Sequence, residues 1–140
     1  MPEMTRPRPG PMRLVDALQY RLPLGGLVSI LHRASGALMF VLLPFILWMF
    51  DTSVSSEASF ERFSAAFGVG LGFVPGWGVK IVCLVLIWAF LHHLVAGLRH
   101  VWMDVAHAVS KAQGHSSAVV TLVISVGLTV LLGAKLFGLY

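Results

Sequence analysis

Residues 81–98 read IVCLVLIWAFLHHLVAGL, and none of these eighteen positions carries Asp, Glu, Lys or Arg. A membrane helix needs about 20 predominantly apolar residues, so this run is long enough to form the body of one. Two adjacent histidines, His92 and His93, interrupt it. The stretch therefore predicts a membrane-spanning helix that carries polar side chains within the bilayer.

The composition of the whole chain points to the same class of protein. Of 140 residues, 57% are hydrophobic and 11% are charged, whereas soluble domains carry about 25% charged residues. So few charges cannot cover the surface of a soluble protein. We exclude a soluble globular enzyme and a disordered chain. The net charge of +4 lies in segments that flank the apolar runs, which indicates membrane lipid rather than nucleic acid as the partner.

Two further apolar runs complete the predicted spans. Residues 34–50 and 118–134 are uncharged, and Pro44 is expected to kink the first helix, as membrane helices tolerate. We predict an all-α integral membrane protein whose residues 1–140 form a single membrane-anchor domain. The predicted parts are an N-terminal arm over residues 1–22 and transmembrane helices over about 27–50, 79–103 and 118–139.

Residues 63–79 are the one ambiguous segment. They are uncharged, which would fit a fourth span, but they contain five glycines and Pro75. Each interior glycine costs a helix about 1 kcal/mol. We therefore expect an interfacial loop that leads into the second span.

The distribution of charge predicts the orientation in the membrane. Residues 1–33 carry five arginines against two acidic residues, residues 51–80 are net negative by one, and residues 99–117 are net positive by one. Because basic residues concentrate on the cytoplasmic side, we expect a cytoplasmic N-terminus and a C-terminus on the opposite side.

Ionisable side chains inside a span mark a functional site by default, and they form two clusters here. The first is SILHRASG, residues 29–36, and the second is HHLVAGLRHVWMD, residues 92–104. The predicted topology brings both toward the cytoplasmic side. His93 lies about 10 Å deeper than His100 on one helix face, beside the small residues Ala96 and Gly97, which leave room for a flat group.

This arrangement suits a haem, with an axial imidazole in the membrane and basic groups near the headgroups for its propionates. His93 and His100 cannot clamp one iron, because they point the same way at different heights. His32 is expected at about the height of His100, so the second ligand is expected from another polypeptide. For His93 the alternative is an interhelical hydrogen bond. For Arg33 it is a membrane-surface anchor, and for His92 a helix contact or a partner contact.

The chain lacks the motifs of other redox cofactors. Cys83 is the single cysteine, which excludes an intrachain disulfide and a cysteine-ligated zinc or iron–sulfur site. No G-x-G-x-x-G pattern is present, so the sequence encodes no dinucleotide cradle. The sequence of this chain thus contains no motif for a flavin dinucleotide or an iron–sulfur cluster.

Three motifs together resemble a known family. They are YRLP at residues 20–23, SILHRASG at residues 29–36 and HLVAGLRHVWMD at residues 93–104. The chain resembles the cytochrome b556 subunits of succinate dehydrogenase, the larger of the two small membrane anchors of respiratory complex II. The resemblance covers about residues 6–139.

The resemblance implies a role for each motif residue. His93 would be the axial ligand of haem b, shared with a second small anchor subunit. Ser29 and Arg33 would line a ubiquinone pocket. The haem propionates would contact His32, Arg99 and His100. A flavoprotein would oxidise succinate, in the tricarboxylic acid cycle, and an iron–sulfur subunit would pass the electrons to quinone at this anchor. The expected location is a bacterial-type inner membrane, with the N-terminus cytoplasmic and the C-terminus periplasmic.

Two other functions remain open from the sequence. One is the anchor of a fumarate reductase, which works in the opposite direction. The other is a haem-free channel or transporter subunit that uses the buried histidines and arginines as a proton path.

Overall fold

The computed structural model describes residues 21–107 and 110–140, and these residues are almost wholly helical. The elements are α2 (Leu24–Val41), α3 (Leu43–Val54), α4 (Glu57–Gly68), β1 (Gly70–Leu71), β2 (Val74–Pro75), α5 (Gly76–Ala106) and α6 (Lys111–Leu136). The predicted arm over residues 1–22 lies outside the described residues except for its last two positions.

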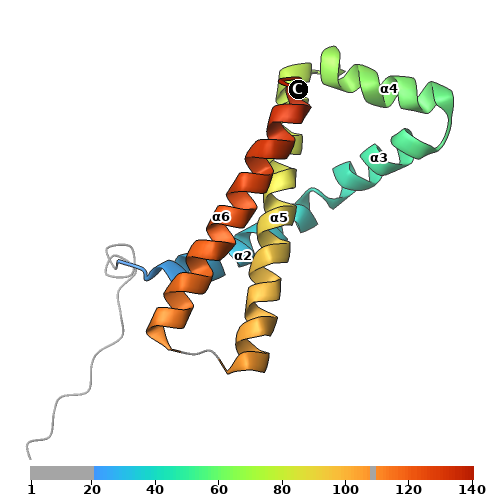
Figure 1. Ribbon diagram of the computed structural model, residues 1–140. Helices are drawn as coiled ribbons and strands as arrows, with labels where there is room; N and C mark the ends of the chain where they lie inside the picture. Colours follow the sequence, from blue (N-terminus) through green and yellow to red (C-terminus); the bar gives the residue numbers. More distant parts are fainter. Residues whose placement is uncertain (1–20, 108–109) are drawn as a thin grey trace, which may run out of the picture.

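Three helices form the bundle. Helices α5 and α6 run antiparallel side by side, and α2 crosses them obliquely and packs against both (Figure 1). The centre of this crossing is built from Val28, Ala96 and Ala118, none of which has exposed surface. Small side chains let helix backbones approach closely where lipid supplies no hydrophobic drive for association.

The outer surface of the bundle is apolar. Large side chains such as Phe40, Leu98 and Leu131 are more than half exposed, as expected for helices surrounded by hydrocarbon. Within the described residues, the helices long and apolar enough to cross a membrane are α2, α5 and α6. The prediction of an all-helical protein with three spans is confirmed. At 31 residues, α5 is about 46 Å long and exceeds the roughly 30 Å hydrocarbon core.

The first predicted span is broken in the structure. Helix α2 ends at Val41 and α3 begins at Leu43, with Leu42 at φ −87° and ψ 6° between them. Pro44 lies in the first turn of α3. Because proline has no N–H and its ring clashes with the preceding turn, the predicted kink takes the form of a helix break two residues before it.

The segment before α5 differs from the prediction. Residues 63–68 were expected in a loop but belong to α4, and residues 70–75 form a two-stranded antiparallel hairpin. A reciprocal pair of hydrogen bonds between Ser56 and Ser59 caps α4. Phe63 and Phe67 pack edge to face and line an apolar cleft against α3 and α5. Gly68 is the last residue of α4, and the other four glycines of the segment lie in the hairpin and at the start of α5. At 12 residues, α4 is too short to span a bilayer.

The ends of the helices fall into two groups. The start of α2, the end of α5 and the start of α6 lie toward one end of the bundle (Figure 1). The α4 helix, the start of α5 and the C-terminus lie at the other. The cytoplasmic placement of the first end stays a prediction from charge.

We predict that Ser56→Ala loosens α4 locally. Loss of an N-cap hydroxyl costs a helix about 1 kcal/mol, and the side chain of Ser56 accepts from the backbone N–H of Ser59 at 3.1 Å. Amide hydrogen exchange in α4 should accelerate about fivefold. Ser64→Ala, an exposed position in the same helix, is the control, and unchanged α4 protection in Ser56→Ala would contradict the prediction.

Candidate functional site

Three imidazoles from two helices meet near the middle of the bundle. We call His32 of α2 and His93 and His100 of α5 the histidine cluster. The rings of His32 and His93 are stacked, with centroids 4.1 Å apart and planes 15° apart. The ring of His100 is tilted by 59° against His32 at 5.3 Å. His32 therefore bridges the two histidines that lie seven residues apart on α5.

One hydrogen bond orients the His93 ring. Its Nδ1 lies 3.0 Å from the carbonyl oxygen of His32, and the buried hydroxyl of Ser35 donates to the same oxygen at 2.8 Å. Because a carbonyl can only accept, Nδ1 carries the proton. The lone pair of the neutral ring is then on Nε2, the arrangement that metal-ligating histidines adopt in proteins.

Glycine makes the approach of α2 to His93 possible. A Cβ on Gly36 would lie 2.8 Å from Cε1 of His93, closer than side chains normally approach. On the other helix, a Cβ on Gly97 would lie 3.5 Å from Nε2 of His32. Gly36 is therefore the residue that allows the two rings to stack, whereas a Cβ on Gly97 would make an ordinary contact.

The surface beside His93 is less bare than the sequence suggested. Ala96 is buried against Val28 and Ala118, and the ring of His32 approaches Gly97. His32 was expected at the height of His100, but its ring lies between the two histidines of α5, stacked on His93 at 4.1 Å and tilted against His100 at 5.3 Å. The cause is the oblique crossing of α2, which carries His32 deeper along α5 than a parallel helix pair would.

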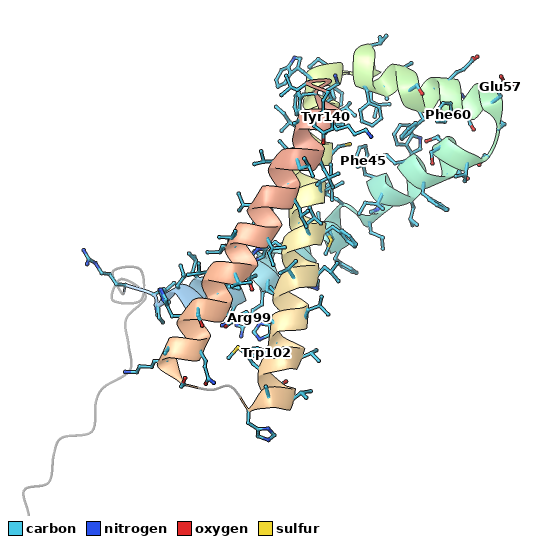
Figure 2. The ribbon with its side chains drawn as sticks, viewed as in Figure 1. Phe45, Glu57, Phe60, Arg99, Trp102 and Tyr140 are labelled. Atoms are coloured by element: carbon cyan, nitrogen blue, oxygen red, sulfur yellow. The ribbon has the colours of Figure 1, made fainter. Side chains whose placement is uncertain are left out.

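Arg99 faces away from the histidine cluster. Its side chain is 8% exposed, its Nε donates to the hydroxyl of Ser117 at 2.9 Å and its Nη2 donates to the carbonyl of Gly114 at 3.2 Å. Figure 2 shows Arg99 between α5 and α6. These bonds satisfy two of its three nitrogens within the α5–α6 interface, so its predicted contact with a haem propionate has no support from this geometry and stays a prediction.

His92 is a contact between helices. It has no exposed surface, its Nδ1 lies 3.3 Å from the hydroxyl of Ser125 on α6, and its ring stacks on Trp88. Its Nε2 has no hydrogen-bond partner among the described residues. Of the two alternatives that the sequence left open for His92, the structure shows the helix contact.

Ser29 and Arg33 lie on α2 next to the face that carries His32. Ser29 is half-buried and Arg33 is exposed. Because they are four residues apart, they are neighbours on the helix surface. The structure thus leaves the Arg33 guanidinium outside the packed interface, where it is accessible to a second chain or a membrane-soluble molecule.

The sequence showed Ser35 and Gly36 as parts of the SILHRASG motif, but no role was predicted for either residue. In the structure they supply the hydroxyl and the bare backbone that receive His93. The available signal was the pair of small residues inside a span, since small residues line contacts between membrane helices.

The histidine cluster can supply one ligand to a metal ion but does not surround the ion with ligands. Among residues 21–107 and 110–140, no group of three or more His, Cys, Asp or Glu side chains is placed to hold a metal ion. The stacked rings of His32 and His93 lie in nearly parallel planes, so their nitrogens do not face each other across an iron. A metal bound at His93 would need its opposite ligand from elsewhere.

Comparison with known proteins identifies the family of the chain. The family model described as succinate dehydrogenase/fumarate reductase transmembrane subunit matches residues 4–132. The chain belongs to this family. It is 30% identical over 119 residues to a succinate dehydrogenase cytochrome b556 subunit of Coxiella burnetii, covering 85% of this chain and 90% of the relative. A protein of the same description from Paracoccus denitrificans is 32% identical over 112 residues, 80% of this chain and 81% of the relative.

We predict that Gly36→Ala forces α2 and α5 apart. The new Cβ would meet the His93 ring, which packs against α2 and cannot retreat freely, and overpacking of this kind costs about 1–3 kcal/mol. The thermal midpoint of the purified protein should fall by several degrees. Gly26→Ala is the matched control on α2, because its Cβ would make ordinary contacts at 3.6 Å. Equal midpoints for both variants would contradict the prediction.

Proposed function

We propose that this transmembrane subunit is the cytochrome b anchor of a succinate:ubiquinone oxidoreductase. It holds haem b together with a second small anchor subunit and forms part of the ubiquinone site. The observation that carries the proposal is the hydrogen bond from His93 Nδ1 to the His32 carbonyl, which leaves Nε2 of a half-buried imidazole as a ligand.

The residues present fit a haem. His93 would hold the iron from this chain, and a second ligand would come from the partner anchor, because His32 and His93 stack rather than face each other. His32 and His100 would contact the propionates. Haem b, when bound, supplies a one-electron carrier inside the membrane. The role of this chain is to hold the orientation of the His93 ring through the hydrogen bond to the His32 carbonyl.

The quinone site uses Ser29 and Arg33. Reduction of ubiquinone adds two electrons and two protons, and negative charge develops on a carbonyl oxygen. Arg33 stabilises that charge, because a guanidinium is a positively charged hydrogen-bond donor and acts more strongly near a low-dielectric pocket than in water. The hydroxyl of Ser29 donates a hydrogen bond to the quinone. The protons come from other groups, since an arginine does not release its own.

The chain lacks the motifs for the remaining cofactors, so its partners supply them. A flavoprotein subunit oxidises succinate, and an iron–sulfur subunit delivers the electrons to this anchor. We propose that the complex lies in a bacterial-type inner membrane, with the N-terminus cytoplasmic and the C-terminus periplasmic. The net positive charge of residues 1–33 supports this orientation.

The family description includes fumarate reductases as well. Both named relatives are succinate dehydrogenase subunits, which favours succinate oxidation as the physiological direction. Rates of succinate-dependent quinone reduction and quinol-dependent fumarate reduction, measured on one preparation, test that choice.

We predict that His93→Ala abolishes or shifts the b-type absorption of the dithionite-reduced complex, because the iron loses an axial ligand. Absorption spectra of the purified complex are the measurement, with co-purification of the partner subunits as the check on assembly. His107→Ala, an exposed position after α5, is the control. An assembled wild-type complex without b-type absorption would refute the proposed haem, and an unchanged His93→Ala spectrum would assign the ligand elsewhere.

We predict that Arg33→Leu separates the two half-reactions. Succinate:quinone activity should fall by on the order of 100-fold, the usual loss when a group that stabilises a developing anion is removed. Succinate oxidation with a soluble artificial acceptor should be retained, because that reaction bypasses the anchor. Arg62→Leu, an exposed arginine of α4, is the control. Equal loss of both activities in Arg33→Leu would indicate an assembly defect and contradict the proposed role.

A further inference from the structure

Helix α5 carries two polar rows with the same spacing. His93 and His100, seven residues apart, face His32 on α2. His92 and Arg99, also seven apart, face α6 instead. Each member of the second row is the chain neighbour of a member of the first, so the two rows are about 100° apart around the helix.

The second row meets hydroxyl groups on α6. Nδ1 of His92 lies 3.3 Å from Oγ of Ser125, and Nε of Arg99 donates to Oγ of Ser117 at 2.9 Å. We call these two side-chain pairs the polar seam. All four side chains are buried or half-buried, and the two hydroxyls lie eight residues apart on one face of α6.

We propose that His92 and Arg99 are positioning residues, which set the rotation of α5 about its axis through Ser125 and Ser117 and thereby aim His93 and His100. This inference rests on the proposed haem role of His93. This role acts through the helix backbone and requires no contact between the residues of the seam and haem or quinone.

A small rotation of α5 would displace the imidazoles by a significant distance. Side chains reach about 5–6 Å from a helix axis, so a rotation of about 10° moves an imidazole nitrogen by about 1 Å. Functional constellations need placement within about 0.5 Å. Apolar contacts resist such a rotation weakly, because lipid tails are as apolar as the side chains that they would replace. Directional hydrogen bonds between α5 and α6 do resist it.

The burial of polar groups in the seam is unfavourable, which argues against a role in packing alone. Nε2 of His92 is buried without a hydrogen-bond partner among the described residues, and leaving a buried polar atom unsatisfied is unfavourable. Burying the Arg99 guanidinium is also unfavourable before its hydrogen bonds are counted. Apolar side chains of similar volume would avoid both penalties, so the directional bonds are the property that distinguishes these residues from packing residues.

The hydroxyls on α6 allow a mild test in the assembled complex. Ser125→Ala and Ser117→Ala each remove one partner of the seam without altering α5. Ser125→Cys is included in parallel, so that the test stands if the alanine variant fails to assemble. Ser116→Ala is the matched control, because its hydroxyl donates within α6 to the Gln113 carbonyl. Ser125→Thr, which keeps the hydroxyl, tests rescue.

The readouts are the low-spin haem g values in electron paramagnetic resonance and the haem midpoint potential, both of which respond to the orientation of the axial imidazoles. We expect shifted g values and potential in Ser125→Ala, Ser125→Cys and Ser117→Ala, with haem retained, and wild-type values in Ser116→Ala and Ser125→Thr. Unchanged g values and potential in assembled seam variants would overturn the positioning role and leave the haem role standing. Absence of haem from the wild-type complex would instead overturn the proposed function, and this inference with it.

Discussion

The hydrogen bond between His93 Nδ1 and the His32 carbonyl joins the two helices on which the site depends. A backbone carbonyl inside a membrane has no water to bond, so an additional donor that reaches it is firmly held. Ser35 donates to the same oxygen, and Gly36 leaves space for the ring. The contact therefore fixes the separation of α2 and α5 together with the direction of the imidazole.

Helix α5 makes different contacts with α2 and with α6. Toward α2 it presents His93 and His100, and the half-buried His93 ring stacks on His32 and bonds to its carbonyl through Nδ1. Toward α6 it carries the polar seam, where Arg99 and His92 meet Ser117 and Ser125. In a bilayer, apolar surface alone discriminates poorly between helix rotations. Directional hydrogen bonds on one face of such a helix therefore help to orient the side chains on its other face.

Much of the arrangement of spans and site residues can be predicted from the sequence. Long uncharged runs mark the bodies of the spans, and histidines or arginines within the spans mark the site because their burial is unfavourable. Pro44 predicts the break in the first span. Residues 63–68 show the limit of this reasoning. The glycines from Gly68 onward suggested a loop over the whole segment, but residues 63–67 contain none, and the Ser56–Ser59 cap and the packing of Phe63 on Phe67 stabilise a helix there.

The sequence by itself determined the class of protein, the spans and the residue types that can serve a redox cofactor, because hydrophobicity and charge are properties of each side chain. Tertiary structure alone decided which side chains meet. His32 stacks on His93 since α2 crosses α5 obliquely, and Arg99 turns to α6 since Gly114 and Ser117 offer it acceptors. Crossing angle and helix rotation arise from contacts between segments distant in the chain, and no local pattern of residues specifies them.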